Sequence, residues 1–271
     1  MKKNKSLLIA HYHNKGKIRE DLCNFIKKAS KSFNKIIFIS TKLNNNEKKK
    51  IDKFALIISR PNYGYDFYSY KVGLEKIFKE NKKKNETIFF IGSNLIFINP
   101  MRLINQINNN KKIYKTIHGL SKSWEIEEHL QTDMLSIPTS YFYEKEFYNW
   151  WKKIKKFKKR STIIGKYELG FSQFLFKNNI QYDCFFKDNI NDYPNTNIKM
   201  LKKKISNIFF KKVKIYKKNP THFYWKKILK KFGIIKIDLI KKNSNKVDIN
   251  NLKNILGKKK YSKVKLEADS N

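Results

Sequence analysis

The fold class is decided by the stretch Arg60-Pro61-Asn62-Tyr63-Gly64-Tyr65-Asp66-Phe67-Tyr68-Ser69-Tyr70. An apolar run at 54–58 precedes it and is typical of a buried strand, while the apolar residues that follow, up to Phe78, recur at helical spacing. The stretch is therefore predicted to be a strand-to-helix turn, in which Pro61 and Gly64 permit the bend. In open α/β sheets such turns lie at the carboxyl edge of the strands, where ligands bind. Asp66 is therefore a candidate ligand-binding residue, although an Asp at this position also commonly caps a helix.

Strands and helices are predicted to alternate on both sides of this turn. Strands are expected at 6–12, 35–41, 54–58 and 87–91, with helices at 18–33 and from the turn to about residue 80, and a polar loop at 44–50. This alternation predicts an α/β fold built on a mostly parallel, doubly wound sheet that is flanked by helices.

The second half of the chain is expected to complete the same domain. A helix is predicted at 101–109, a strand at 114–120, an aromatic and basic helix at 141–159, a helix that starts at Lys166 and a last core helix that opens at Asn219. Beyond Lys242 the sequence is polar and rich in Lys and Asn. We therefore expect one domain over residues 1–242 and a basic, weakly ordered C-terminal extension over 243–271.

The chain of 271 residues carries a formal net charge of +39, yet its basic residues are almost all lysines. Arginine usually dominates the recognition of bases and phosphates, and no nucleic-acid-binding motif is visible. Nucleic acid is therefore not expected as a partner, whereas attraction to anionic lipid or to sugar phosphates is. The segment 201–217 mixes apolar residues such as Ile205 and Phe209 with lysines, which suits docking at an anionic bilayer or packing on the sheet.

The cysteines Cys23 and Cys184 lie far apart in the sequence and suit a reducing cytosol rather than a disulfide framework. The longest apolar stretch, 88–98, is interrupted at Gly92-Ser93-Asn94 and is too short to span a bilayer, which needs about 20 residues. A soluble protein, or one peripheral to a membrane, is expected. The histidines show no recognised zinc-ligand spacing, so a zinc site is not expected.

Five short motifs occur in order along the chain. They are Ala10-His11-Tyr12, Gly64-Tyr65-Asp66-Phe67, His129-Leu130-Gln131, Tyr167-Glu168-Leu169-Gly170-Phe171-Ser172-Gln173 and Asn219-Pro220-Thr221-His222. Together they resemble the rhamnan synthesis F family, bacterial glycosyltransferases that build rhamnose-containing surface polysaccharides. The resemblance covers about residues 6 to 242. It implies a GT-A-like enzyme on the cytoplasmic face of the plasma membrane, with a nucleotide sugar such as dTDP-L-rhamnose as donor and a lipid-linked glycan as acceptor.

One position departs from the family's pattern. Where members usually carry Asn-Asp-Ser after the fourth strand, this chain has Ile91-Gly92-Ser93, and Asn94 follows. A Mg²⁺ or Mn²⁺ ion that bridges a diphosphate needs hard oxygen ligands, and Asn94 offers only a neutral one. A divalent metal is therefore a candidate cofactor whose usual carboxylate is missing, and lysine and histidine side chains could neutralise the diphosphate instead. The alternative is a non-catalytic protein of the same fold that binds an anionic surface or glycan.

Glycosyl transfer needs a grip on the nucleotide, stabilisation of the departing diphosphate and a base for the acceptor hydroxyl. Strand ends and the resemblance together give these candidates for donor binding: His11, Tyr12, Arg60, Asp66, Ser93, Asn94, His129, Gln131 and His222. Arg60 could reach a phosphate, and His222 stands at a helix start, which offers free N–H groups to an anion. The simpler alternatives are a capping role for Asp66 and His222 and a buried, hydrogen-bonded His129.

Glu168 is the candidate general base for inverting transfer, and Asp133 is its rival. Lys166-Tyr167-Glu168-Leu169-Gly170 is expected to place Glu168 at the start of a helix. There the helix dipole would stabilise the carboxylate and lower the pKa of Glu168, while some desolvation is expected to act in the opposite direction. Stabilisation by the dipole is also a sufficient structural reason for an acid at that position.

Overall fold

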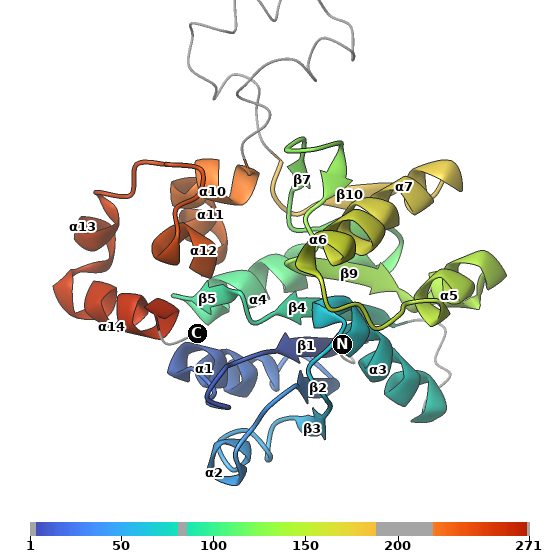
Figure 1. Ribbon diagram of the computed structural model, residues 1–271, viewed down its shortest axis with the longest axis horizontal. Helices are drawn as coiled ribbons and strands as arrows, with labels where there is room; N and C mark the ends of the chain where they lie inside the picture. The colour runs from blue at the N-terminus through green and yellow to red at the C-terminus, as the bar shows by residue number, and fades with distance from the viewer. Residues whose placement is uncertain (1–3, 81–85, 188–218, 270–271) are drawn as a thin grey trace, which may run out of the picture.

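The computed structural model describes residues 4–80, 86–187 and 219–269 (Figure 1). In this part of the chain a seven-stranded sheet has the order β10-β6-β9-β4-β1-β2-β3. Its strands are β1 (Lys5–His11), β2 (Lys35–Ser40), β3 (Leu56–Ser59), β4 (Thr87–Gly92), β6 (Ile117–Gly119), β9 (Met134–Pro138) and β10 (Tyr182–Cys184). Neighbouring strands are parallel except at β9, which is antiparallel to both β4 and β6. The sheet confirms the predicted α/β, GT-A-like class.

Helices cover both faces of this sheet because its central strands are apolar on both sides. Leu7 and Ile9 of β1 pack on one face with α1 (Glu20–Ala29), α4 (Pro100–Asn109) and α11 (Trp225–Phe232). Leu8 and Ala10 pack on the other with α3 (Tyr65–Glu80), α5 (Lys145–Lys152) and α7 (Gly170–Lys177). Continuous apolar strands that are buried on both faces are typical of parallel sheets.

The segment after residue 219 returns to the middle of the domain. It contains α10 (Pro220–Phe223), α11, β11 (Ile234–Lys236) and α12 (Ile237–Lys241). Strand β11 pairs antiparallel with β5 (Leu95–Phe97), which directly follows β4. Gly233 makes the turn from α11 into β11 with φ +68°, and a Cβ there would clash with the carbonyl oxygen of Asn99. The turn therefore requires glycine.

The C-terminal extension differs from the weakly ordered tail that its polarity predicts. It forms α13 (Leu252–Leu256) and α14 (Lys258–Asp269), which lie beside α12 and β5 in Figure 1. Leu252 packs with Trp225 and Leu239, while Val264 and Ala268 pack with Ile96 and Ile237. A few widely spaced apolar residues are enough to dock these helices, although the composition around them is polar.

Several shorter elements also differ from the prediction. The expected loop at 44–50 contains α2 (Asn45–Lys48), and the aromatic helix α5 is shorter than expected. The helix expected from Lys166 begins earlier, as α6 (Arg160–Ile163), and continues through a π-helical turn, η3 (Ile164–Leu169), into α7. The remaining elements are η1 (Lys111–Tyr114), η2 (Thr139–Tyr143), β7 (Lys122–Ser123) and β8 (His129–Leu130).

No helix in the described ranges is long and apolar enough to cross a membrane. The segment 201–217, which is predicted to dock on a bilayer or on the sheet, lies outside the described residues.

Candidate active site

A cavity of about 810 Å³ lies at the carboxyl edge of the parallel strands. Every site residue nominated from the sequence lines it: His11, Tyr12, Arg60, Asp66, Ser93, Asn94, His129, Gln131, Asp133, Glu168 and His222. They come from the ends of β1 and β4, the turn before α3, the approach to β9, the π-helical turn η3 and helix α10. Parallel strand ends, an antiparallel strand start and two helices thus converge on one site.

The turn before α3 is held in an unusual backbone conformation. Gly64 and Tyr65 have φ values of +70° and +50°, and Tyr65 is therefore a non-glycine residue in the left-handed region. Arg60, a predicted phosphate contact, instead donates hydrogen bonds to the carbonyl oxygens of Pro61, Tyr63 and Tyr65 and to Ser69 Oγ. Its guanidinium therefore braces the turn.

Asp66 is the second residue of α3, so it is inside the first helical turn rather than at the cap. A Cβ at Gly92 would lie 3.1 Å from Asp66 Oδ2 and 2.7 Å from Asn94 Oδ1, so both oxygens lie directly over this glycine. Burial and the nearby Asp133 raise the pKa of Asp66 to about 6, while Arg60, Arg160 and Lys236 act in the opposite direction. Asn94 Oδ1 is buried and has no hydrogen-bond partner among the described residues.

Asp133 forms the centre of a small polar network. Its Oδ2 atom lies 2.9 Å from Lys236 Nζ, and its Oδ1 atom accepts a hydrogen bond of 2.5 Å from Asn94 Nδ2. Burial lowers the pKa of Lys236, but the charge and hydrogen bond of Asp133 outweigh that effect, and the pKa is raised. Lys236 is therefore an ammonium ion at neutral pH.

Glu168 lies in the π-helical turn η3, inside a continuous helical segment. The expectation of a helix-start position with a lowered pKa is therefore wrong. Burial, followed by the negative charge of Asp133, raises the pKa of Glu168 to about 7, although Lys236 and Arg160 oppose the shift. A carboxyl group with this pKa exchanges its proton near neutral pH. π-helical turns frequently occur at functional sites. Glu168 is the only acidic residue of this turn, and it lines the cavity.

His222 presents one nitrogen of its ring to the site. Its Nδ1 atom accepts from the Asn245 amide at 3.2 Å, which leaves the proton on Nε2. The Nε2 atom is buried and has no partner in the described part of the chain. Burial, followed by the charge of Lys236, lowers the pKa of His222 to about 4. At neutral pH His222 can therefore offer one uncharged N–H donor.

Three other predicted residues already have protein partners. His11 Nδ1 lies 2.9 Å from Ser40 Oγ, and burial followed by Arg19 lowers the pKa of His11 to about 3. His129 Nδ1 lies 2.8 Å from the carbonyl oxygen of Glu127. Gln131 Oε1 accepts a longer hydrogen bond of 3.4 Å from Ser121 Oγ. All three side chains line the cavity, as donor-binding residues would. Their hydrogen bonds within the protein fit equally well a purely structural role.

Tyr12 lines the cavity as an exposed side chain, whereas Ser93 is buried. Tyr12 is 45% exposed, and its backbone N–H donates to Ser93 Oγ at 3.2 Å. An exposed aromatic ring at the end of β1 offers a surface on which a base can stack.

Sequence reasoning missed several cationic residues that line the same cavity, namely Lys236, Arg160, Lys241 and Lys242. Arg160 lies 3.5 Å from Asp238 and is largely exposed at the rim. Nothing in the sequence distinguishes the three lysines from the many others, because Lys and Arg together number 61 and are almost all lysines.

The residues present do not fit a carboxylate-bound metal ion. Among the described residues, no group of three or more His, Cys, Asp and Glu side chains is arranged to hold one. Both oxygens of Asp133 accept N–H donors, and the turn after β4 supplies Gly92, Ser93 and Asn94 in place of an acid. Hard divalent cations need several oxygen ligands that converge.

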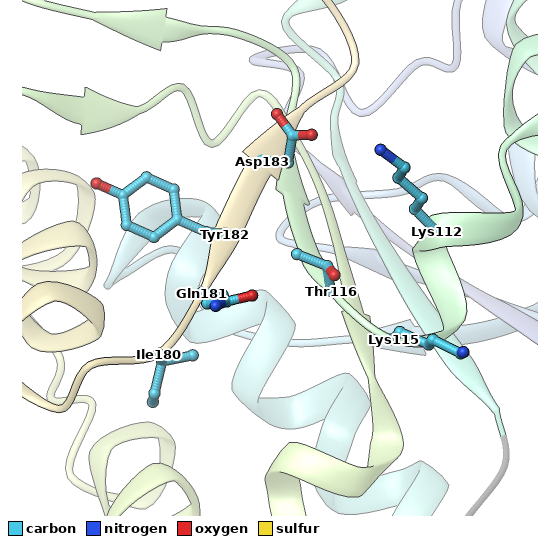
Figure 2. A pocket seen from close by; sticks show the side chains of 7 residues that line it. All are labelled: Lys112, Lys115, Thr116, Ile180, Gln181, Tyr182 and Asp183. Carbon is cyan, nitrogen blue, oxygen red and sulfur yellow. The ribbon is translucent and has the colours of Figure 1, made fainter.

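A second hollow, of about 570 Å³, lies against the edge strand β10 (Figure 2). Its lining includes Lys112, Lys115 and Asp183. The ring of Tyr182, another lining residue, points away from Lys112 in Figure 2. None of the residues nominated from the sequence lies there.

Acidic, cationic and amide side chains thus line a cavity at the carboxyl edge of an α/β sheet, where open sheets of this kind bind their ligands. The family model of rhamnan synthesis protein F matches residues 36–270, which is most of the chain. The chain therefore belongs to the rhamnan synthesis protein F family, and the predicted resemblance is confirmed. Membership supports a glycosyltransferase-like function.

Solved structures of low identity also match the chain. A 4-diphosphocytidyl-2C-methyl-D-erythritol synthase matches with 8% identity and a TM-score of 0.43, over 74% of this chain and 97% of that one. A putative nucleotide-diphospho-sugar transferase from Desulfovibrio desulfuricans matches with 9% identity and a TM-score of 0.36, over 79% and 92%. Glucosyl-3-phosphoglycerate synthase from Mycobacterium tuberculosis matches with 16% identity and a TM-score of 0.31, over 44% of each chain. No curated protein sequence matches significantly.

Proposed function

We propose that the protein is a glycosyltransferase that moves a sugar, rhamnose or a similar one, from a nucleotide-sugar donor to a growing surface polysaccharide. One observation carries the proposal: residues from separate motifs line a single cavity at the carboxyl edge of the sheet. Family membership supports the reaction class and the rhamnose-containing product.

Donor binding is assigned to the side of the cavity formed by β1, β4 and the turn before α3. Tyr12 stacks on the base, and Asp66 accepts hydrogen bonds from the sugar or nucleotide hydroxyls. His222 donates its Nε2–H to a diphosphate oxygen, for which a neutral donor at a helix start is suited. Arg60 holds the turn that presents Asp66, since its donors are used by the turn itself.

Glu168 is assigned as the general base. Direct displacement with inversion needs one carboxylate that takes the proton of the acceptor hydroxyl while the diphosphate leaves. A pKa of about 7 gives Glu168 both an available unprotonated form and useful basicity at neutral pH. Asp133 is the weaker candidate, because Lys236 and Asn94 occupy both of its oxygens.

The acceptor is proposed to be a lipid-linked glycan at the cytoplasmic face of the bacterial plasma membrane. The net charge of +39 suits a protein that works beside an anionic bilayer. Vesicle sedimentation with anionic and neutral lipids, at low and high salt, tests this part separately. Absence of binding to both lipids would remove the membrane from the proposal, whereas equal binding to both would remove only the role of charge.

Transfer is tested by incubating the purified protein with a panel of dTDP-, UDP- and GDP-sugars and rhamnose-containing acceptors. Mass spectrometry then measures glycosylated product and released nucleotide diphosphate. We expect product with one donor class, and the anomeric configuration of the product by NMR reports inversion or retention.

The missing carboxylate after β4 favours one other candidate, a non-catalytic protein of the same fold that binds an anionic surface or glycan. Donor binding without any product from the whole panel, with a rhamnose polymer still bound, would select that candidate and reject the transferase.

A further inference from the structure

We propose that Lys236 supplies, as a fixed ammonium group, the positive charge at the donor diphosphate that a divalent metal ion would otherwise provide. The inference rests on the proposed function and deepens it: donor binding does not require Mg²⁺ or Mn²⁺.

The backbone places Lys236 beside the turn where the usual metal-binding carboxylate is missing. In the β5–β11 pairing Lys236 lies opposite Leu95, and the N–H of Ile237 donates to the carbonyl oxygen of Asn94 at 2.8 Å. The chain enters this strand through Gly233, where an added Cβ would clash with the carbonyl oxygen of Asn99. Lys236 is thus carried by a rigid strand end rather than by a loop.

The ammonium group is buried and only partly used. Its side chain is 13% exposed, and Asp133, its partner at 2.9 Å, is 10% exposed. An ammonium has three N–H donors, and within the described residues Asp133 Oδ2 is its hydrogen-bond acceptor. Lys236 lines the same cavity as His222, whose Nε2 atom is a buried ring nitrogen without a partner in the described chain. Two donors that lack acceptors at one site are suited to the oxygens of an anion.

The charge of Lys236 acts on the whole site. It opposes the rise that burial causes in the pKa of Asp66 and of Glu168, and it adds to the lowering of the pKa of His222. Asp133 holds the lysine in place and prevents it from losing its proton despite burial. The pair is therefore a built-in cation whose position does not depend on a bound ion.

The competing metal site would have to use Asn94 Oδ1 and Asp66 Oδ2, the two oxygens over Gly92. Asp133 would have to bind the metal through oxygens that already accept from Lys236 and Asn94, which places the ammonium group beside the cation. A sugar hydroxyl is the simpler ligand for these oxygens, since it can donate its proton to either of them.

Isothermal titration with UDP, dTDP and GDP, each in EDTA and in excess Mn²⁺ or Mg²⁺, tests the inference. We expect the affinity of the parent protein for its preferred diphosphate to change by less than about twofold with metal. Lys236→Gln should weaken the affinity for that diphosphate by at least about tenfold, and Lys236→Arg should largely preserve the affinity. The matching nucleoside, which lacks phosphates, should bind all variants alike.

Two further variants keep the result interpretable. Lys230→Gln removes one exposed charge from α11, outside the cavity, and should not change the affinity. Asp133→Asn/Lys236→Gln removes both charges of the pair, so that no unpaired carboxylate is left buried if the single variant fails to fold. This double variant should bind the diphosphate as weakly as Lys236→Gln.

The outcomes separate the inference from the proposed function. A parent protein that needs Mn²⁺ or Mg²⁺ for a gain of about tenfold or more overturns the inference and leaves the transferase intact. Parent-like diphosphate binding by the folded Lys236→Gln or double variant overturns it as well. A parent protein that binds none of the diphosphates, with or without metal, rejects the proposed function itself.

Discussion

Glu168 is the residue on which the proposed chemistry depends most directly. Glu168→Gln keeps the size of the side chain but cannot accept a proton. We expect turnover to fall by about two to four powers of ten, while nucleotide affinity changes little. Steady-state kinetics and titration on the same preparation measure both quantities. Near-parental turnover would move the role to Asp133, for which Asp133→Asn is the matching variant.

The pH dependence of the reaction follows from the same carboxyl group. Because the base must be unprotonated, kcat/KM should rise with pH up to about 7, the pKa of Glu168, and then level off. Asp66, with a pKa of about 6, should steepen the acid limb. His222 and His11, at about 4 and about 3, remain neutral throughout this range. A flat profile between pH 5 and 8 would contradict the assignment.

Stability should show the opposite trend. The pKa of Glu168 rises on folding from 4.5 to about 7, so the native state binds more protons between these values. Stability is therefore lost as pH increases through that window. Relative to the parent, Glu168→Gln should be more stable at pH 8 by about 1–3 kcal/mol and nearly equal at pH 4. Urea denaturation at both pH values measures the difference, and an equal difference at both would place its cause outside this ionisation.

At the scale of elements, two glycines can be compared: one whose backbone conformation and surroundings exclude a side chain, and one that has room for it. Gly64 has φ +70°, and a Cβ there would lie 2.5 Å from the Cβ of Tyr68. Gly64→Ala should therefore destabilise the fold by about 2–4 kcal/mol and weaken nucleotide binding, because it disturbs the turn that presents Asp66. Gly165, in the π-helical turn, has nothing within 4 Å of its Cβ position. Gly165→Ala should be neutral or stabilising by up to about 1 kcal/mol. Thermal denaturation compares the two variants, and a Gly64→Ala variant as stable as the parent would show that the turn tolerates a side chain.

Local patterns predict most elements of the sheet because β1, β2, β3 and β4 are continuous apolar runs. They do not predict β5 and β11, which are three residues long and exist through their pairing. The π-helical turn was also missed, because one extra residue in a helix leaves no compositional signal. The error in the pKa of Glu168 follows from that miss, since a helix start and a buried helix interior shift a carboxyl pKa in opposite directions.

At the scale of the molecule, the C-terminal helices are predicted to stabilise the domain. Leu252 is fully buried, so Leu252→Ala should lower the free energy of unfolding by about 2–4 kcal/mol. Leu266 lies on the same extension but is 71% exposed, and Leu266→Ala should change stability by less than about 0.5 kcal/mol. Denaturant titration of both variants measures the contrast. Two neutral variants would restore the view of a weakly ordered tail.

The sequence predicts which acidic, histidine and amide residues form the candidate site, but it does not predict where the positive charges of the site lie. Motifs with Asp, Glu and His stand out against the sequence, and their side chains do line one cavity. Lys236 could not be found in this way, because it is one lysine among many and reaches the site only through the β5–β11 contact. The charge of Arg60 predicts a phosphate contact, but the sequence does not predict the hydrogen bonds by which Arg60 braces the turn.

The pairing of β5 with β11 also has a consequence for biosynthesis. A ribosome releases β1 to β4 long before it releases Lys236, and domains begin to fold while they are being translated. A nascent chain with a complete parallel sheet therefore still lacks the cation and the histidine proposed for the diphosphate. Translation that stops before this strand would therefore yield a chain without the groups that the proposed function assigns to the diphosphate.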